Sequence, residues 1–161
     1  AASGPPVNRV DMRAGDALTP EQSPRTEGRT LRITVEIPEP RGDGVLVAHG
    51  GLVHGYSLYV RGGRLTFSLR RDGRLQTVAA DEPLGDRPTT VTVSLGPKGR
   101  VTLRANGQTV AGPTPVGPMP RTPGQGLSAG FDSEDPTGDY PPEFPYPGRL
   151  GTIVVETRPR G

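Results

Sequence analysis

The sequence contains no cysteine and no tryptophan, and its aromatic residues are four tyrosines and three phenylalanines among 161 residues. Without cysteine there can be no disulfide, no thiolate nucleophile and no zinc–thiolate site. No apolar run approaches the roughly 20 residues that a membrane-spanning helix needs. The formal net charge is only +2, so a strongly basic surface for nucleic acid is also excluded.

The chain opens with AASGPP and has no methionine at its start. This opening is typical of a mature exported protein after cleavage at an A-x-A type site, although a chain shortened at its start would look the same. We expect a periplasmic or extracellular location.

Glycine and proline are abundant, with 24 and 20 residues, and they separate short segments of alternating polarity. In residues 31–37, LRITVEI, apolar and polar residues alternate with a period of two, which is typical of a half-buried strand. Similar strands are predicted at residues 44–49, 56–61, 64–70, 71–79, 89–95, 100–106, 108–112, 127–132 and 150–157. Two-residue hairpin turns are predicted at Gly62-Gly63, Asp72-Gly73 and Asn106-Gly107.

About ten short strands with very little helix predict an all-β fold, an antiparallel β-sandwich of the jelly-roll type. Residues 112–126 hold five prolines, which no central strand tolerates. Residues 133–149 form a second proline-rich segment. Both are expected to be surface loops that cross from one sheet to the other.

Residues 1–28 are polar and proline-rich and are predicted to be an extended arm, with a single β-sandwich domain at residues 29–161. Within the arm, Val10, Met12 and Ala14 alternate with charged residues. This pattern predicts an edge strand, either on the sheet of the same chain or on that of a neighbouring copy. A loosely held terminus is the alternative.

One stretch resembles the C-terminal β-domain of bacterial arylsulfatases. The G-V-L-x-A-x-G-G strand of that family matches Gly44–Gly51, its aromatic-S-L-Y-V strand matches Tyr56–Val60, and its L-T-F strand matches Leu65–Phe67. Similar strand–turn patterns follow at Val91–Gly112 and in the closing segment. The resemblance implies a concanavalin-like jelly roll that accompanies a catalytic domain and performs no chemistry. The sulfatase C/S-x-P-x-R signature is absent.

The only two histidines, His49 and His54, flank a glycine pair. Two imidazoles without a nearby carboxylate are too few for a typical metal site. We therefore interpret both as residues that decorate a loop between two strands, with a metal site as the alternative.

A loop with four acidic residues is the better metal candidate. Its carboxylates are Asp132, Glu134, Asp135 and Asp139. Calcium binds six to eight oxygens on such irregular loops, although the spacing is not that of an EF-hand. A solvated acidic loop is the alternative to a structural Ca²⁺ site.

Three aromatic residues of the same loop, Tyr140, Phe144 and Tyr146, lie among prolines. A rigid aromatic surface of this kind could stack on a sugar or dock against a protein. Alternatively, the rings cap one open end of the sandwich.

No pair of facing carboxylates and no G-x-S-x-G motif indicates catalysis. The sequence therefore favours a non-catalytic accessory or interaction module that docks on a partner protein or a glycan. The alternative is a structural subunit that assembles with copies of itself through the arm. Fold alone does not choose between them.

Overall fold

The computed structural model describes residues 8–159. Residues 1–7 of the predicted arm, with the AASGPP opening, and residues 160–161 lie outside the described part. Within it, the chain forms eleven strands and a single short 3₁₀ turn at Pro20–Gln22. The all-β prediction with very little helix is confirmed. No described helix is long and apolar enough to cross a membrane.

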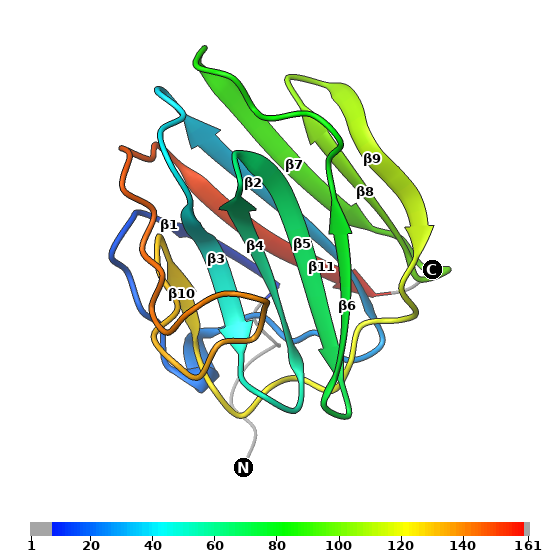
Figure 1. Ribbon diagram of the computed structural model, residues 1–161. Helices are drawn as coiled ribbons and strands as arrows, with labels where there is room; N and C mark the ends of the chain where they lie inside the picture. The colour runs from blue at the N-terminus through cyan, green and yellow to red at the C-terminus, as the bar shows by residue number, and fades with distance from the viewer. Residues whose placement is uncertain (1–7, 160–161) are drawn as a thin grey trace.

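The strands form two antiparallel sheets that pack face to face (Figure 1). The six-stranded sheet has the order β1 (Arg9–Met12), β11 (Ile153–Pro159), β2 (Arg29–Ile37), β7 (Thr89–Leu95), β8 (Arg100–Ala105) and β9 (Gln108–Pro115). The five-stranded sheet has the order β10 (Leu127–Ala129), β3 (Gly44–Gly50), β4 (Gly55–Arg61), β5 (Arg64–Arg71) and β6 (Arg74–Ala79). This is the predicted jelly-roll β-sandwich.

The core lies between the sheets and follows from the period-two pattern of the strands. Ile33 of β2 pairs with Val155 of β11 on one side and with Val93 of β7 on the other, and all three side chains are fully buried. Leu58 and Phe67 supply the matching layer from β4 and β5. Each such side chain contributes about 1.5–3 kcal/mol when it is removed from water.

The three predicted hairpin turns join β4 to β5, β5 to β6 and β8 to β9. Asp72 and Asn106 adopt φ values of 53° and 50°, and the glycine that follows each also has a positive φ. Such turns need two left-handed residues, which explains the Asp-Gly and Asn-Gly pairs.

The two proline-rich segments do cross between the sheets, from β9 to β10 and from β10 to β11. The predicted start of the first crossover, at residue 112, was wrong, however. Strand β9 continues to Pro115 and includes Pro113. This is possible because β9 is an edge strand, where a missing N–H costs no ladder hydrogen bond.

Strand β1 lies at the edge of the six-stranded sheet of its own chain, where it pairs with β11. Met12 is only 2% exposed and belongs to the core, and Val10 packs against that core. Ala14 lies beyond the end of the strand, beside Gly130. The structure therefore places this edge strand on the sheet of its own chain.

Candidate functional site

The acidic and aromatic loop between β10 and β11 covers the outer face of β3 and β4 in the five-stranded sheet. The ring of Tyr140 packs edge-on against Tyr59 of β4, with centroids 4.9 Å apart, and stacks on Phe144 at 5.6 Å. Val45 and Ala48 of β3 complete this second, smaller apolar cluster. Because one face of β3 meets the main core and the other meets this loop, every residue of β3 is buried.

Asp132 is the polar anchor of this loop and is only 1% exposed. Its carboxylate accepts hydrogen bonds from the Tyr140 hydroxyl and from the backbone N–H groups of Glu134 (3.0 Å) and Thr137 (3.2 Å). Burial raises the pKa of Asp132 above the usual aspartate value, and the three hydrogen bonds oppose that rise. The oxygens of this carboxylate are thus already used to shape the loop.

The other predicted metal ligands point elsewhere. Asp139 forms an ion pair with Arg61, and the side chains of Glu134 and Asp135 are exposed. In residues 8–159, no group of three or more histidine, aspartate or glutamate side chains is arranged to hold a metal ion. Calcium binding by this loop stays a prediction, and it would require Asp132 to give up bonds that it makes in this structure.

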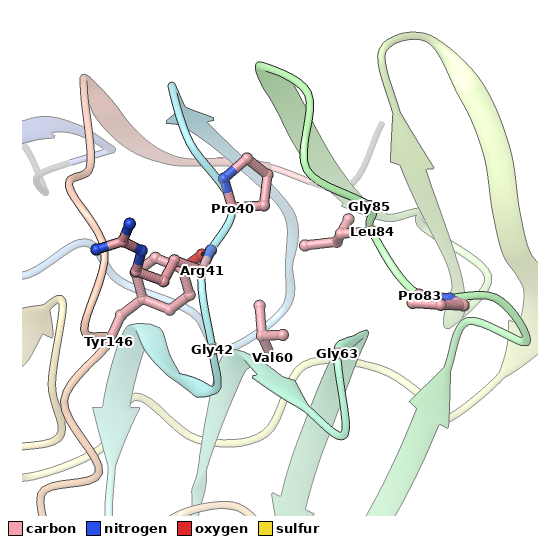
Figure 2. A pocket seen from close by; sticks show the side chains of 9 residues that line it. All are labelled: Pro40, Arg41, Gly42, Val60, Gly63, Pro83, Leu84, Gly85 and Tyr146. Atoms are coloured by element: carbon pink, nitrogen blue, oxygen red, sulfur yellow. Dashed lines mark hydrogen bonds between the residues drawn. The ribbon is translucent and has the colours of Figure 1, made fainter.

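The three predicted aromatic residues do not form one surface. Tyr140 and Tyr146 are 8% and 7% exposed, and they belong to different apolar clusters. Figure 2 shows Tyr146 at one end of the sandwich, beside a hollow of about 170 Å³ that Val60 and Leu84 also line. The Tyr146 hydroxyl accepts a hydrogen bond from the backbone N–H of Arg41 at 2.6 Å. With two rings buried, only Phe144 keeps part of its surface for a ligand.

The interpretation of both histidines as loop residues was wrong for His49. This residue lies in β3, is fully buried, and its Nδ1 is 3.1 Å from the hydroxyl of Tyr56. Burial lowers the pKa of the His49 imidazole to about 4. His54 does lie in the β3–β4 loop, where its ring is 3.7 Å from the carboxylate of Asp72. The two imidazoles therefore belong to separate environments.

The outer face of the six-stranded sheet carries a second set of polar side chains. The register places Glu156 of β11, Arg32 of β2 and Ser94 of β7 side by side in one row across the strands. A hollow of about 290 Å³ lies over this row. Its lining residues are Thr30, Leu31, Arg32, Ser94, Leu95, Gly96, Pro97, Glu156 and Arg158. Leu31 and Leu95 point into the core, so the polar side chains define the chemistry of the hollow.

Charges of both signs meet in this hollow. Glu156 is held between two arginines, with its carboxylate 3.9 Å from Arg9 and 3.8 Å from Arg158. Arg32 is exposed and forms no ion pair or side-chain hydrogen bond within residues 8–159. The carboxylate accepts hydrogen bonds, the guanidinium groups donate them, and the Ser94 hydroxyl does both. This combination is suited to a ligand rich in hydroxyl groups.

No protein-family model and no curated protein matches this chain. Solved structures with a similar fold do match it. The IT-sialidase CBM40 of Ruminococcus gnavus matches with a TM-score of 0.61 at 16% identity, over 93% of this chain and 90% of that one. The chain has the jelly-roll fold of this carbohydrate-binding module. The NanB sialidase of Streptococcus pneumoniae matches with a TM-score of 0.65 at 10% identity. Here 93% of this chain aligns with only 26% of the sialidase, so the likeness concerns about a quarter of that protein.

The predicted site residues did not include Arg32, Ser94, Glu156 or Arg158. Alternation with apolar residues predicts an outward-facing side chain at Arg32, Ser94 and Glu156, and that prediction is correct. Arg158 lies one residue beyond the predicted strand. What the pattern lacks is the strand order, because β11, β2 and β7 are far apart in the chain and become neighbours only in the folded sheet.

Proposed function

We propose that the chain is a non-catalytic carbohydrate-binding module that holds a glycan on the outer face of its six-stranded sheet. The observation that carries this proposal is the hollow over Arg32, Ser94 and Glu156, on a sheet face that no loop of residues 8–159 covers with an apolar cluster. The fold shared with the Ruminococcus gnavus module is consistent with it.

Sugar recognition by this face would rest on hydrogen bonds. Glu156 can accept from two neighbouring hydroxyl groups of a sugar ring, and Arg32 can donate to ring or hydroxyl oxygens. No aromatic side chain lies among the lining residues, so stacking contributes little. Each charge-assisted hydrogen bond contributes about 1.5–3 kcal/mol, and a few of them correspond to dissociation constants in the millimolar to micromolar range.

Export from the cytoplasm, docking beside a partner protein and the resemblance to arylsulfatase β-domains belong to the same proposal. Together they would make the chain a module outside the cell that holds a partner protein near a glycan. The lack of catalytic function is part of this proposal as well.

Self-assembly is the second candidate function, and one observation favours it. Among the described residues, strand β1 has a partner on one side only, so its other edge can pair with a strand from another copy of the chain. Light scattering tests this directly. A monomeric native mass would reject self-assembly, whereas an oligomer that dissociates when residues 1–14 are removed would support it.

Titration of the ¹⁵N-labelled chain with lactose and with sialyllactose tests the main proposal, since the structurally similar proteins are parts of sialidases. We expect saturable shifts at residues of β2, β7 and β11. Replacing Arg32 by alanine should weaken binding at least about tenfold. The matched control is Arg74→Ala on the exposed surface of β6, which should bind as the natural chain does.

If neither these probes nor a broader panel of oligosaccharides shifts the resonances of β2, β7 and β11, the proposal is rejected. It is equally rejected if Arg32→Ala and Arg74→Ala bind a responding sugar alike.

A further inference from the structure

A separate hollow of about 350 Å³ lies where the N-terminal segment meets the crossover between β9 and β10. Its lining residues are Arg25, Glu27, Arg29, Arg121 and Thr122. The two segments are joined by Thr26, which donates from its hydroxyl to the carbonyl of Pro120 (3.2 Å) and from its backbone N–H to the hydroxyl of Thr122 (3.0 Å). These bonds fix the walls of the hollow.

The hollow has an unbalanced charge. Arg25, Arg29 and Arg121 contribute three positive charges, and Glu27 contributes the one negative charge. Within residues 8–159, none of these four side chains forms an ion pair with another residue. Cations held close together repel one another, and the single carboxylate of Glu27 offsets only part of that repulsion. An anion bound in the hollow would remove that repulsion.

Two residues that line the hollow, Arg29 and Thr122, have hydrogen atoms to donate and no acceptor among the described residues. The Nη1 atom of Arg29 is shielded from solvent and has no hydrogen-bond partner within residues 8–159. The hydroxyl of Thr122 accepts from the backbone N–H groups of Thr26 and Glu27 (3.4 Å). Its oxygen is therefore engaged as an acceptor, and its own proton remains to be donated. A buried charged donor without an acceptor is costly.

We propose that this hollow is an anion site that binds a tetrahedral oxyanion, the sulfate or phosphate group of a ligand. Three guanidinium groups and one hydroxyl line the hollow as donors, and sulfate or phosphate presents several acceptor oxygens at once. The planar fork of arginine matches two such oxygens in parallel. This site does not depend on the glycan face over Arg32, because the two hollows share no lining residue.

Isothermal titration of the chain with inorganic phosphate and with inorganic sulfate, at constant ionic strength, tests the proposal. The variant Arg25→Gln/Arg121→Gln removes two exposed cations, so its fold should persist, and circular dichroism checks this. We expect saturable binding to the natural chain and a loss of at least about tenfold in the variant. The matched control is Arg64→Gln/Arg74→Gln, which removes the same charge from exposed positions on β5 and β6.

Binding that is absent, or that falls equally in both double variants, overturns the proposal, because a general effect of net charge then explains the result. The single variant Arg121→Glu provides a second check and should weaken binding further than Arg121→Gln.

Competition with dextran sulfate and with unmodified dextran identifies the source of the anion. Displacement of phosphate by dextran sulfate alone supports the site with a polymer-borne sulfate as its ligand. Phosphate binding without such displacement supports it with a small free anion. Displacement by unmodified dextran would contradict the proposal, since that polymer carries no oxyanion.

Discussion

The two sheets of the sandwich have polar outer faces that the chain treats in opposite ways. On the five-stranded sheet, Tyr59, Ser68 and Thr77 hydrogen-bond in a line across β4, β5 and β6, and the loop after β10 lies over β3 and β4. On the six-stranded sheet, Glu156, Arg32 and Ser94 form a similar row with a hollow above it. The polar side chains of the five-stranded sheet therefore hydrogen-bond to one another, whereas Arg32 on the six-stranded sheet makes no ion pair or side-chain hydrogen bond within residues 8–159.

Substitutions in the loop-covered part of the five-stranded sheet should lower the stability more than those on the open face of the six-stranded sheet. Asp132→Ala should have the largest effect. The change leaves the Tyr140 hydroxyl and two backbone N–H groups without their acceptor, and each unsatisfied buried group costs about 1–3 kcal/mol. We expect the free energy of unfolding to fall by about 4 kcal/mol in urea titrations. Asp135→Ala, at an exposed position of the same loop, is the control and should change it by less than about 0.5 kcal/mol.

The free energy of unfolding should depend on pH through His49, which lies on the inner side of the five-stranded sheet. Its pKa is about 4 in the folded chain and about 6.5 when unfolded. Because the unfolded chain binds the proton more tightly, stability is retained above pH 6.5 and lost as the pH falls toward 4. The loss at pH 4 should be roughly 3 kcal/mol.

Urea unfolding of the natural chain and of His49→Gln across this pH range isolates the contribution, because the carboxylates titrate in both. The same pH dependence in the two proteins would show that His49 is not the responsible group.

A smaller effect is expected where the loop approaches the covered sheet most closely. A Cβ atom at Gly138 would lie 2.5 Å from the ring of Tyr140 and 2.6 Å from the hydroxyl of Ser57. Gly138→Ala should therefore displace the loop and cost about 1–3 kcal/mol, measured by thermal unfolding. Gly124→Ala has open space around it and should leave the melting temperature nearly unchanged. Equal melting temperatures for Gly138→Ala and Gly124→Ala would mean that the loop does not pack against the sheet as described.

The smallest effect on stability is expected on the open face. Arg32→Ala removes an exposed side chain without an ion pair in the described residues, so the free energy of unfolding should change by less than about 0.5 kcal/mol. Glycan binding should nevertheless fall at least about tenfold, as proposed above. A large loss of stability in this variant would show that Arg32 has a structural role and would remove the contrast between the two faces.

Local patterns predicted the strands and hairpins well because their causes are local. Alternation along residues 31–37 reflects one buried face, and Asn106-Gly107 reflects a turn that needs two positive φ angles. The positions that were misread depend on distant contacts. His49 resembles a loop residue beside glycines, but it lies in β3, between β10 and β4, and its side chain is fully buried.

The candidate sites show the same limit. Tyr140 and Asp132 look like exposed ligand-binding residues in a polar, proline-rich loop, yet the loop folds back over a sheet formed much earlier in the chain. Arg32 and Glu156 look like ordinary solvated residues until the register places them in one row. In both cases the missing information is which segments become neighbours.

The position of β11 has a consequence for how the protein is made. This strand is one of the last parts of the described chain to be synthesised, yet it lies between β1 and β2, which are among the first. While the ribosome is still translating the intervening residues, β1 has no strand to pair with and β2 exposes an open edge. The six-stranded sheet, and with it the surface that we assign to glycan binding, can therefore be completed only after residue 159 has emerged.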